Sequence, residues 1–222
     1  PPWCSVLEGF ALHGMGRYEA ALERFRDGLE TMDPEEARKW RDPAVVLDSR
    51  GSNILDDAAE ADSDAEAGAD SADQLDTGPR AEWEKVRARV WTLADPLYLV
   101  GGNDRESEHY ARWTFSMIHQ DAQNAYGMPW GSDLEELTLR YGWDRGWERV
   151  RRDIRRASGP PSMIGHQPPG GREFAPPGRV LAAPSDAAPG AWVLEDVRPS
   201  SAYLPAYAPA LLPGVAQIAV FH

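Results

Sequence analysis

Proline places the strongest limit on where this chain can form helices. Of its 222 residues 19 are prolines, and twelve of these lie between Gly159 and Pro213. Proline lacks a backbone N–H and its ring clashes with the preceding helical turn, so a long helix is excluded there. We expect residues 159–222 to wrap over the core in extended form. Short strands are predicted in this region at residues 179–181, 191–194 and 216–221.

Apolar residues at helical spacing predict a helical hairpin over residues 5–33, broken at Gly14 and Gly16. The string GRYEAALERFRDGLETMDP resembles the second half of a tetratricopeptide repeat, a helix–turn–helix unit. Gly28 departs from that pattern, because the repeat prefers alanine there. A single unit cannot bury its own apolar face, so it must pack on the rest of the chain or on another protein.

Helix signals mark three further segments, at residues 34 to about 40, 80–94 and about 104–123. The first begins with an Asp-Pro pair, and the third begins with Asn103 and Glu106 at the spacing of a capping box. Residues 134–141 fit both helical and strand spacing, and the flanking glycines favour a strand.

Residues 51–79 carry nine Asp and Glu residues and no Lys or Arg, so they hold most of the net charge of −13. Such a segment buries too little apolar surface to order itself, and we expect a solvated acidic linker. A docking site for a basic partner is the alternative. Binding to nucleic acid is not expected, because it rests on Lys and Arg side chains that neutralise phosphates.

Three short pieces follow one another between residues 90 and 150. DPLYL and ND precede an EHYAR helix, residues 129–133 read PWGSD, and residues 139–142 read LRYG. Together they resemble the bacterial GWxTD domain family, with Pro129 in place of the motif glycine and Trp143-Asp144 in place of a proline-rich continuation. The resemblance implies an exported protein that combines this domain with helical repeats. It implies no mechanism, because the family has no settled activity.

A second likeness concerns the whole chain. The hairpin, an arginine-rich stretch at residues 145–156 and the proline-rich tail together look similar to accessory subunits on large bacterial membrane complexes. A photosynthetic reaction-centre/light-harvesting complex is one candidate host.

These segments predict an α+β fold in four parts. The parts are a tetratricopeptide-like helical region (1–50), the acidic linker (51–79), a GWxTD-like domain of helices and short strands (80–158) and the extended proline- and glycine-rich region (159–222).

The sequence shows no pattern typical of catalysis, cofactor binding or a metal site. No serine stands in a G-x-S-x-G context, and the single cysteine, Cys4, lies near the terminus without an obvious base. His109 and His119 lie ten residues apart on one expected helix and so on different faces, which makes them poor joint metal ligands. We predict no catalytic, cofactor-binding or metal-binding residue.

The sequence favours a non-catalytic scaffold or accessory subunit. It would bind other protein subunits of a membrane complex from the periplasmic side, peripheral to the membrane. Candidate partner-binding residues are Trp130, Asp133, Trp143, Trp147, Arg149, Arg152 and Arg156. The alternative is a hydrolase-type enzyme with chemistry around Asp133, His109 or His166.

Simpler roles stay open for the same residues. Ser132 or Asp133 can cap the next element, with Trp130 packed beneath it. The candidate arginines follow three- and four-residue steps. They fit a solvated helix face as well as a contact with an anionic partner surface or with lipid headgroups.

Overall fold

The computed structural model describes residues 1–68, 80–95, 101–120, 122, 131–143, 146–149, 163–166 and 175–186. The longer helices are α1 (Pro2–Gly14), α2 (Tyr18–Glu30), α3 (Pro34–Arg41), α4 (Ser49–Gly68), α5 (Arg80–Ala94), α6 (Asp104–His119) and α7 (Ser132–Tyr141). The shorter elements are the 3-10 helices η1 (Ala44–Val46) and η3 (Pro184–Asp186), helix α8 (Gly178–Ala182) and the strands β1 (Gly146–Arg149) and β2 (Met163–His166).

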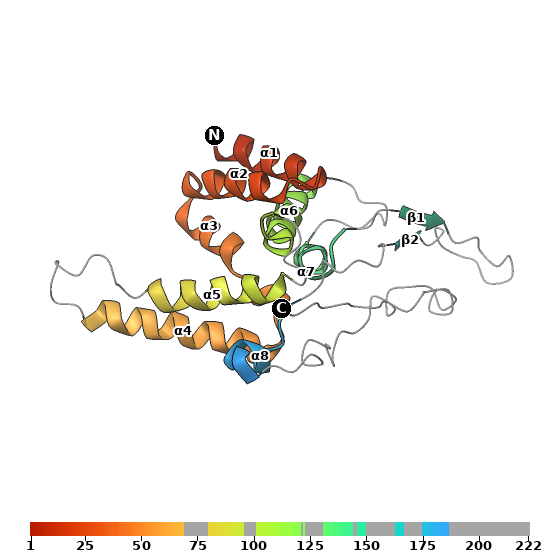
Figure 1. The fold of residues 1–222 in the computed structure, drawn as a ribbon. Coiled ribbons are helices and arrows are strands. Elements are labelled where there is room, and N and C mark those ends of the chain that lie inside the picture. The colour runs from red at the N-terminus through yellow and green to blue at the C-terminus, as the bar shows by residue number, and fades with distance from the viewer. Residues whose placement is uncertain are drawn as a thin grey trace, which may run out of the picture.

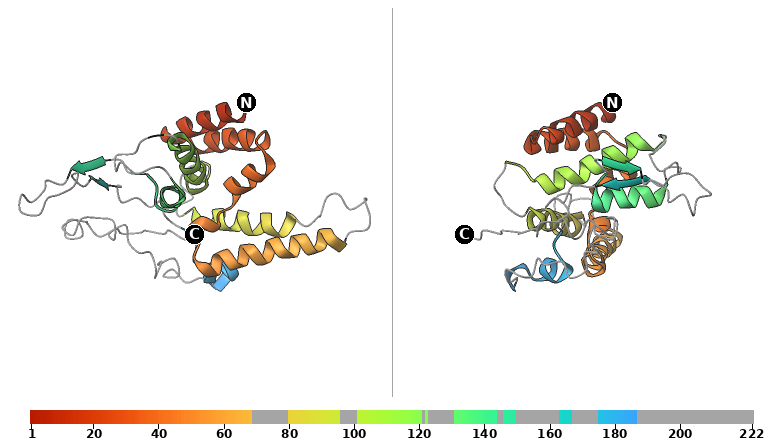
Figure 2. Two further views of the ribbon diagram at one scale, coloured as in Figure 1. Left: turned by 180° about the vertical axis from the view of Figure 1, so that it is seen from behind. Right: turned by 90° about the vertical axis from the view of Figure 1, so that its right-hand side faces the viewer.

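The helices form a stack with α6 near its middle (Figures 1 and 2). The α1–α2 hairpin packs against α6 through both of its helices, and α7 packs against α6 as well. The pair α4 and α5 forms the other end of the stack, with α8 against both. Helix α3 and η1 carry the chain from the hairpin to α4.

The predicted α+β class is wrong, because helices make up most of the described residues. Strands β1 and β2 form one antiparallel ladder, in which Gly146 pairs with His166 and Arg149 pairs with Met163. A ladder of four residues per strand is too small to form a layer of the fold. The described architecture is therefore all-α. Residues 146–149 of the arginine-rich stretch form strand β1, so the interpretation of the arginines as a solvated helix face does not hold for Arg149.

The strand predicted at residues 134–141 is helix α7. The flanking glycines end a helix here and do not bound a strand, since Gly131 is the N-cap and Gly142 follows the last turn with φ of +84°. The expectation that Ser132 or Asp133 is the capping residue is wrong for the same reason. Leu139, an apolar position of the strand alternative, is buried in the core, whereas Leu134 and Leu137 of the helical alternative are half-buried.

The other helix predictions are confirmed. The hairpin forms as α1 and α2, α5 spans the predicted residues 80–94, and α3 and α6 begin where their cap signals predict, although α6 ends at His119 and not near residue 123. Asp33 accepts hydrogen bonds from the backbone N–H groups of Glu35 and Glu36, and Asn103 accepts one of 2.7 Å from the N–H of Glu106. Local capping chemistry therefore sets these boundaries.

Part of the predicted acidic linker is ordered, which corrects that expectation for residues 51–68. They belong to α4, and Leu55 is buried between α4 and α5. Asp62 is also buried and accepts a 3.0 Å hydrogen bond from the backbone N–H of Trp83, in the first turn of α5. One acidic side chain thus joins the two helices. Residues 69–79 lie outside the described residues.

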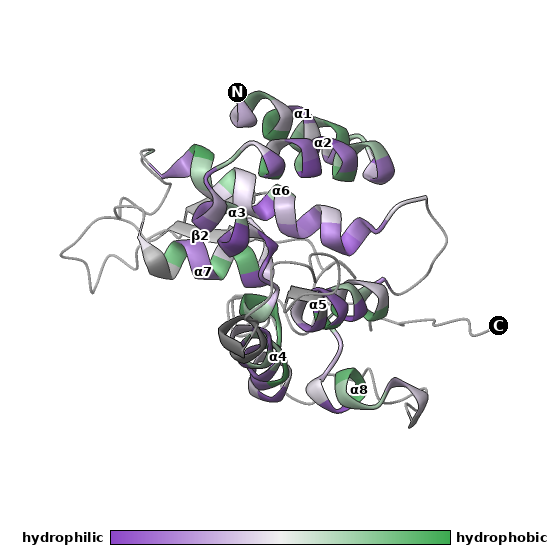
Figure 3. Ribbon diagram, turned by 90° about the vertical axis from the view of Figure 1, so that its left-hand side faces the viewer, coloured by the Kyte–Doolittle hydropathy of each residue, from purple (hydrophilic) through white to green (hydrophobic). Residues whose placement is uncertain are grey.

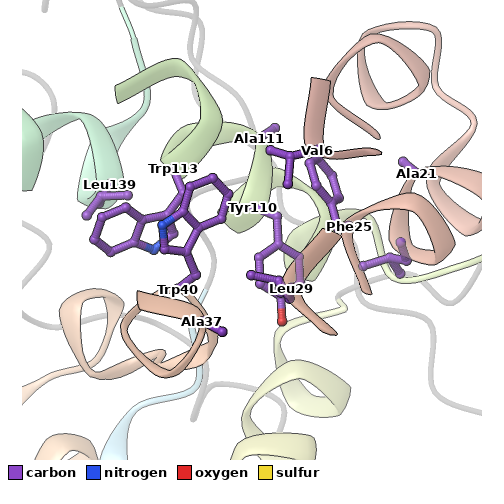
Figure 4. Packing of buried hydrophobic residues seen from close by; sticks show 11 residues of the cluster. Val6, Ala21, Phe25, Leu29, Ala37, Trp40, Tyr110, Ala111, Trp113 and Leu139 are labelled. Atoms are coloured by element: carbon purple, nitrogen blue, oxygen red, sulfur yellow. The ribbon is translucent and has the colours of Figure 1, made fainter. Parts of the chain in front are cut away.

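One apolar cluster joins the hairpin to α3, α6 and α7 (Figure 4). At its centre the ring of Trp40 from α3 stacks on that of Trp113 from α6, with centroids 5.7 Å apart and an interplanar angle of 15°. The rings of Phe25 from α2 and Tyr110 from α6 lie 5.5 Å apart. The parts predicted as residues 1–50 and 80–158 therefore share a core.

A second apolar cluster holds α4, α5 and α8 together. Its buried members are Leu47, Leu55, Ala58, Val86, Val90, Trp91, Ala94, Ala175 and Leu181. The proline-rich region thus contributes to the core, but residues 178–182 do so as helix α8, so the strand predicted at 179–181 is wrong. The strands predicted at 191–194 and 216–221 lie outside the described residues.

Asp48 fixes α8 on α4. It precedes α4 and accepts a 2.7 Å hydrogen bond from the backbone N–H of Gly51. The same carboxylate accepts the N–H of Gly178 at 3.1 and 3.0 Å. A Cβ atom on Gly178 would lie 2.6 Å from both Cβ of Arg50 and the backbone N of Gly51, so only glycine permits this approach.

We predict that Gly28→Ala lowers the free energy of unfolding. Glycine to alanine inside a helix usually stabilises by up to about 1 kcal/mol. Here the new Cβ would lie 2.6 Å from Cγ2 of buried Val6 and 3.1 Å from the backbone oxygen of Pro2. The clash should dominate and cost about 1–3 kcal/mol, measured from the urea midpoint of unfolding.

Gly14→Ala in α1 is the matched control, because its Cβ would meet no atom within 4 Å. Its midpoint should stay or rise. A Gly28→Ala protein as stable as the control would contradict the close packing of α1 on α2.

Candidate functional site

Helix α6 has polar residues on all sides, yet it lies inside the molecule. Every residue from Arg105 to Thr114 is buried, and the run reads RESEHYARWT. Figure 3 shows its hydrophilic colouring between the hairpin and α5. Buried polar and charged groups are costly unless they are paired. The partners of these residues are therefore the first place to look for function.

A histidine from α1 reaches a serine and a glutamate of α6. The Nε2 atom of His13 lies 2.7 Å from Oε2 of Glu108, and its Nδ1 lies 2.9 Å from Oγ of Ser107. Nε2–H donates to the carboxylate in the neutral tautomer that leaves Nδ1 free to accept the serine hydroxyl. Arg112 Nε donates to the second oxygen of Glu108 at 3.1 Å. All four side chains are buried.

Arg112 extends this network to α7. Its Nη1 donates to the carbonyl oxygens of Leu139 and Arg140, at 3.1 and 2.8 Å. These carbonyls belong to the last turn of α7, where the helix dipole favours a positive charge. Gly142 follows directly, and a Cβ there would lie 3.4 Å from Nη2 of Arg112. The guanidinium thus fixes where α7 ends.

Serine, histidine and glutamate are the side chains of a hydrolytic triad, but this set lacks the access that catalysis needs. Ser107 has no exposed surface, and its Oγ faces His13 within the core. A nucleophile must reach the reacting carbon of a substrate. The contacts instead join α1, α6 and α7, so we interpret the set as structural.

The charge on Glu108 is stabilised where it lies. Burial alone raises the pKa of a carboxyl group, but the hydrogen bond from His13 and the charge and hydrogen bond of Arg112 outweigh it and hold the pKa of Glu108 far below its usual range. Glu108 is therefore ionised at every physiological pH. A buried carboxylate with two such partners behaves as a permanent ion pair.

A second carboxylate, Glu106, joins α6 to α5 and α2. Arg87 from α5 donates to it at 3.2 Å, and Arg26 from α2 forms a longer ion pair of 3.8 Å. The hydroxyl of Tyr110 lies 3.4 Å from the same Arg87. Burial and the nearby Glu106 charge raise the pKa of the Tyr110 hydroxyl, so it remains a neutral donor. Glu106 and Glu108 thus connect α6 to different neighbours.

His109 lies between the two apolar clusters. Its Nε2–H donates to the backbone carbonyl of Trp40 at 2.8 Å, and its ring centroid lies 4.9 Å from that of Trp91. Burial and the charges of Arg105, Arg112 and Arg87 lower its pKa to about 3. The ring is fully buried and neutral, so the catalytic role that the enzyme alternative gave His109 is not available to it.

The described partner-binding candidates are not brought together by this network. Trp143 is half-buried and stacks on Phe115, with centroids 4.8 Å apart, so it serves the packing of α6. Asp133 lies in the first turn of α7, and Trp147 and Arg149 lie in β1; their side chains are not described. Trp130, Arg152 and Arg156 lie outside the described residues.

Sequence reasoning missed the residues that carry the network. No sequence pattern predicted the contacts among His13, Ser107, Glu108 and Arg112, because those of His13 join segments about 94 residues apart. Two signals were present: Glu108 and Arg112 are four residues apart on a helix, and His13 is the one histidine of a strongly apolar helix. Among the described residues, no three His, Cys, Asp or Glu side chains are arranged to hold a metal ion.

Comparisons with known proteins find no match: no family model fits the chain, and neither a curated protein nor a solved structure does. The resemblance to the GWxTD domain family therefore stays a prediction from short pieces of sequence. One piece, the EHYAR helix, supplies Glu108, His109 and Arg112 to the contacts described above. None of the described helices is long and apolar enough to cross a membrane.

We predict that Glu108→Gln strongly destabilises the protein. The amide keeps the shape but leaves the buried Arg112 without its counter-charge, which costs about 3–5 kcal/mol for a buried pair. Glu136→Gln is the control, because Glu136 pairs with Arg140 on the exposed side of α7 at the same four-residue spacing. That change should cost about 0.5 kcal/mol or less. Equal urea midpoints for the two variants would contradict the structural interpretation.

A second prediction concerns acid. His109 has its ordinary pKa of 6.5 in the unfolded chain and a pKa of about 3 in the folded chain. Between these two pH values the unfolded chain binds a proton at His109 and the folded chain does not. Stability therefore falls as the pH drops from 6.5 towards 3, by about 2 kcal/mol between pH 7 and pH 5. His109→Gln keeps a donor for the Trp40 carbonyl and cannot titrate.

Urea unfolding at pH 5, 6 and 7 measures this effect. The variant should lose less stability than the wild type between pH 7 and pH 5, by about the 2 kcal/mol assigned to His109. Parallel pH profiles for the two proteins would show that His109 is not held neutral by the fold.

Proposed function

We propose that the protein is a non-catalytic scaffold or accessory subunit that binds other proteins. One observation carries the proposal: the outward face of α1 is apolar and exposed. Trp3, Leu7 and Met15 are 37%, 38% and 70% exposed, on a helix whose other side is locked into the core. Single exposed apolar residues are common, but a continuous apolar face on a folded helix is typical of an interaction surface.

The interior supports the same proposal. The groups of α6 that could do chemistry are paired inside the core, as Ser107 and Glu108 are with His13 of α1. They maintain the shape of the hairpin that presents α1. The hydrolase alternative keeps Asp133 and His166 as candidates, and no contact of the described residues favours it.

The compartment and the host remain proposals from sequence likeness. A periplasmic position, peripheral to the membrane, and a photosynthetic reaction-centre/light-harvesting complex as host rest on the resemblances of the hairpin, the arginine-rich stretch and the proline-rich tail. Contact with lipid headgroups rests on the arginine-rich stretch alone.

Co-purification tests the proposal. We predict that the tagged full chain, recovered from gently solubilised membranes of its source, brings down other proteins in fixed stoichiometry, identified by mass spectrometry. The tag alone is the control. A chain that elutes as a lone monomer under these conditions, with no protein in fixed ratio, would overturn the proposed function.

A further inference from the structure

The exposed face of α1 is one continuous apolar row. Trp3, Leu7, Ala11 and Met15 follow one another at four-residue steps, and all four are exposed. Residues four apart are neighbours on a helix surface, so these positions follow one another along α1 to its C-cap, Met15. Figure 3 shows hydrophobic residues along α1 at the outer edge of the molecule.

Cys4 and Gly14 lie within the same arc of the helix, carry no charge and are both exposed. At 100° per residue the six positions cover an arc of about 120°, which is the width of a typical buried helix face. Glu8 lies at one margin of this arc. Helix α1 has no other acidic side chain and no Lys or Arg, and its one histidine, His13, is buried.

The opposite side of α1 cannot turn outward to hide the row. Val6 is fully buried against α2, and a Cβ atom on Gly9 would lie 2.9 Å from the ring of Phe25. His13 is held by its hydrogen bonds to Ser107 and Glu108. The row is therefore a fixed, preformed surface, which reduces the ordering cost of binding.

We propose that this row binds an amphipathic helix of a partner protein, with aliphatic side chains on the row and a Lys or Arg beside Glu8. The proposal rests on the function proposed above and names its surface and its partner. Ala11 and Gly14 are small, and a Cβ on Gly14 would meet no atom within 4 Å, so a second helix can approach closely between Leu7 and Met15. Helix-on-helix packing of an apolar face is a common mode of recognition.

Charge selects this occupant over a second copy of the chain. Glu8 is the middle residue of α1 (Pro2–Gly14), so antiparallel pairing of two α1 helices about a two-fold axis places Glu8 against Glu8 of the other copy. Like charges at that position oppose pairing, and each copy carries a net charge of −13. A basic residue of a partner helix at the same place is attracted by Glu8 and by the negative net charge of the chain.

Charge also disfavours a lipid surface. Helices that lie on membranes carry Lys and Arg beside the apolar face, and these meet anionic headgroups. Helix α1 has no Lys or Arg, and Glu8 would face the headgroups. A protein helix with a basic margin therefore fits the surface best.

Two synthetic peptides test the proposal against the full chain. Both are 18-residue helices with leucines at three- and four-residue spacing, and they differ in carrying lysines or glutamates along the margins of the stripe. Fluorescence anisotropy should show the lysine peptide binding at least tenfold more tightly than the glutamate peptide. Equal affinities would overturn the charge assignment.

Variants locate the site. Leu7→Glu should weaken binding of the lysine peptide at least tenfold, and Glu8→Lys should reverse the preference between the peptides. Both residues are exposed, so neither change disturbs the core. Glu23→Lys, on an exposed position of α2, makes the same charge change elsewhere and should keep the wild-type preference. An affinity for the lysine peptide that Leu7→Glu leaves unchanged would overturn the proposal.

The other occupants give distinct results. Dimerisation of the wild-type chain in sedimentation equilibrium, lost in Leu7→Glu, would assign the row to a second copy. Binding to phosphatidylcholine/phosphatidylserine vesicles, lost in Leu7→Glu, would assign it to lipid. Either result overturns the proposal.

Co-purification separates this inference from the proposed function. If Leu7→Glu still recovers the partner that the wild type recovers, the partner binds elsewhere and only the present proposal fails. If the wild type recovers no partner, the proposed function itself fails.

Discussion

The fold depends on a buried carboxylate that three helices share. Glu108 lies on α6, accepts from His13 of α1 and pairs with Arg112, which in turn holds the last carbonyls of α7. A charge buried without partners would cost several kcal/mol, so these elements must meet in one arrangement. An apolar core alone tolerates sliding of its helices, whereas this set of directional contacts does not. The outward direction of α1 follows from the same contacts, since His13 fixes how the helix is rotated.

Local chemistry made much of the helix pattern predictable, and tertiary contacts decided the rest. Asp33 and Asn103 cap their helices as their sequence neighbours indicate. Residues 134–141 fit two periods, and the guanidinium of Arg112, which favours the helix, comes from another part of the chain. The acidic composition of residues 51–68 led to the wrong prediction of a linker, because Leu55 and Asp62 meet their partners only when α5 packs beside α4.

The candidate site was less predictable than the fold, because its interpretation depends on which side chains are buried. Sequence alone shows that His109 and Glu108 lie on a helix, but not that both are enclosed. Aromatic density drew the prediction towards Trp143, which is half-buried and packs against Phe115. The exposed row on α1 could be predicted from the sequence only in part. The hairpin pattern implies that an apolar face needs a partner, and the structure shows which part of that face α2 and α6 leave uncovered.

Asp48 gives the chain a particular order of assembly. The carboxylate serves the first turn of α4 through Gly51 and reaches Gly178, which is 130 residues further along. During synthesis from the N-terminus, the first turns of α4 are made long before α8 exists. The end of the second cluster that Leu181 fills therefore stays open until residues 178–182 emerge. A nascent chain halted before residue 178 would carry a completed hairpin and an unfinished α4–α5 layer, which is the state that a chaperone would meet.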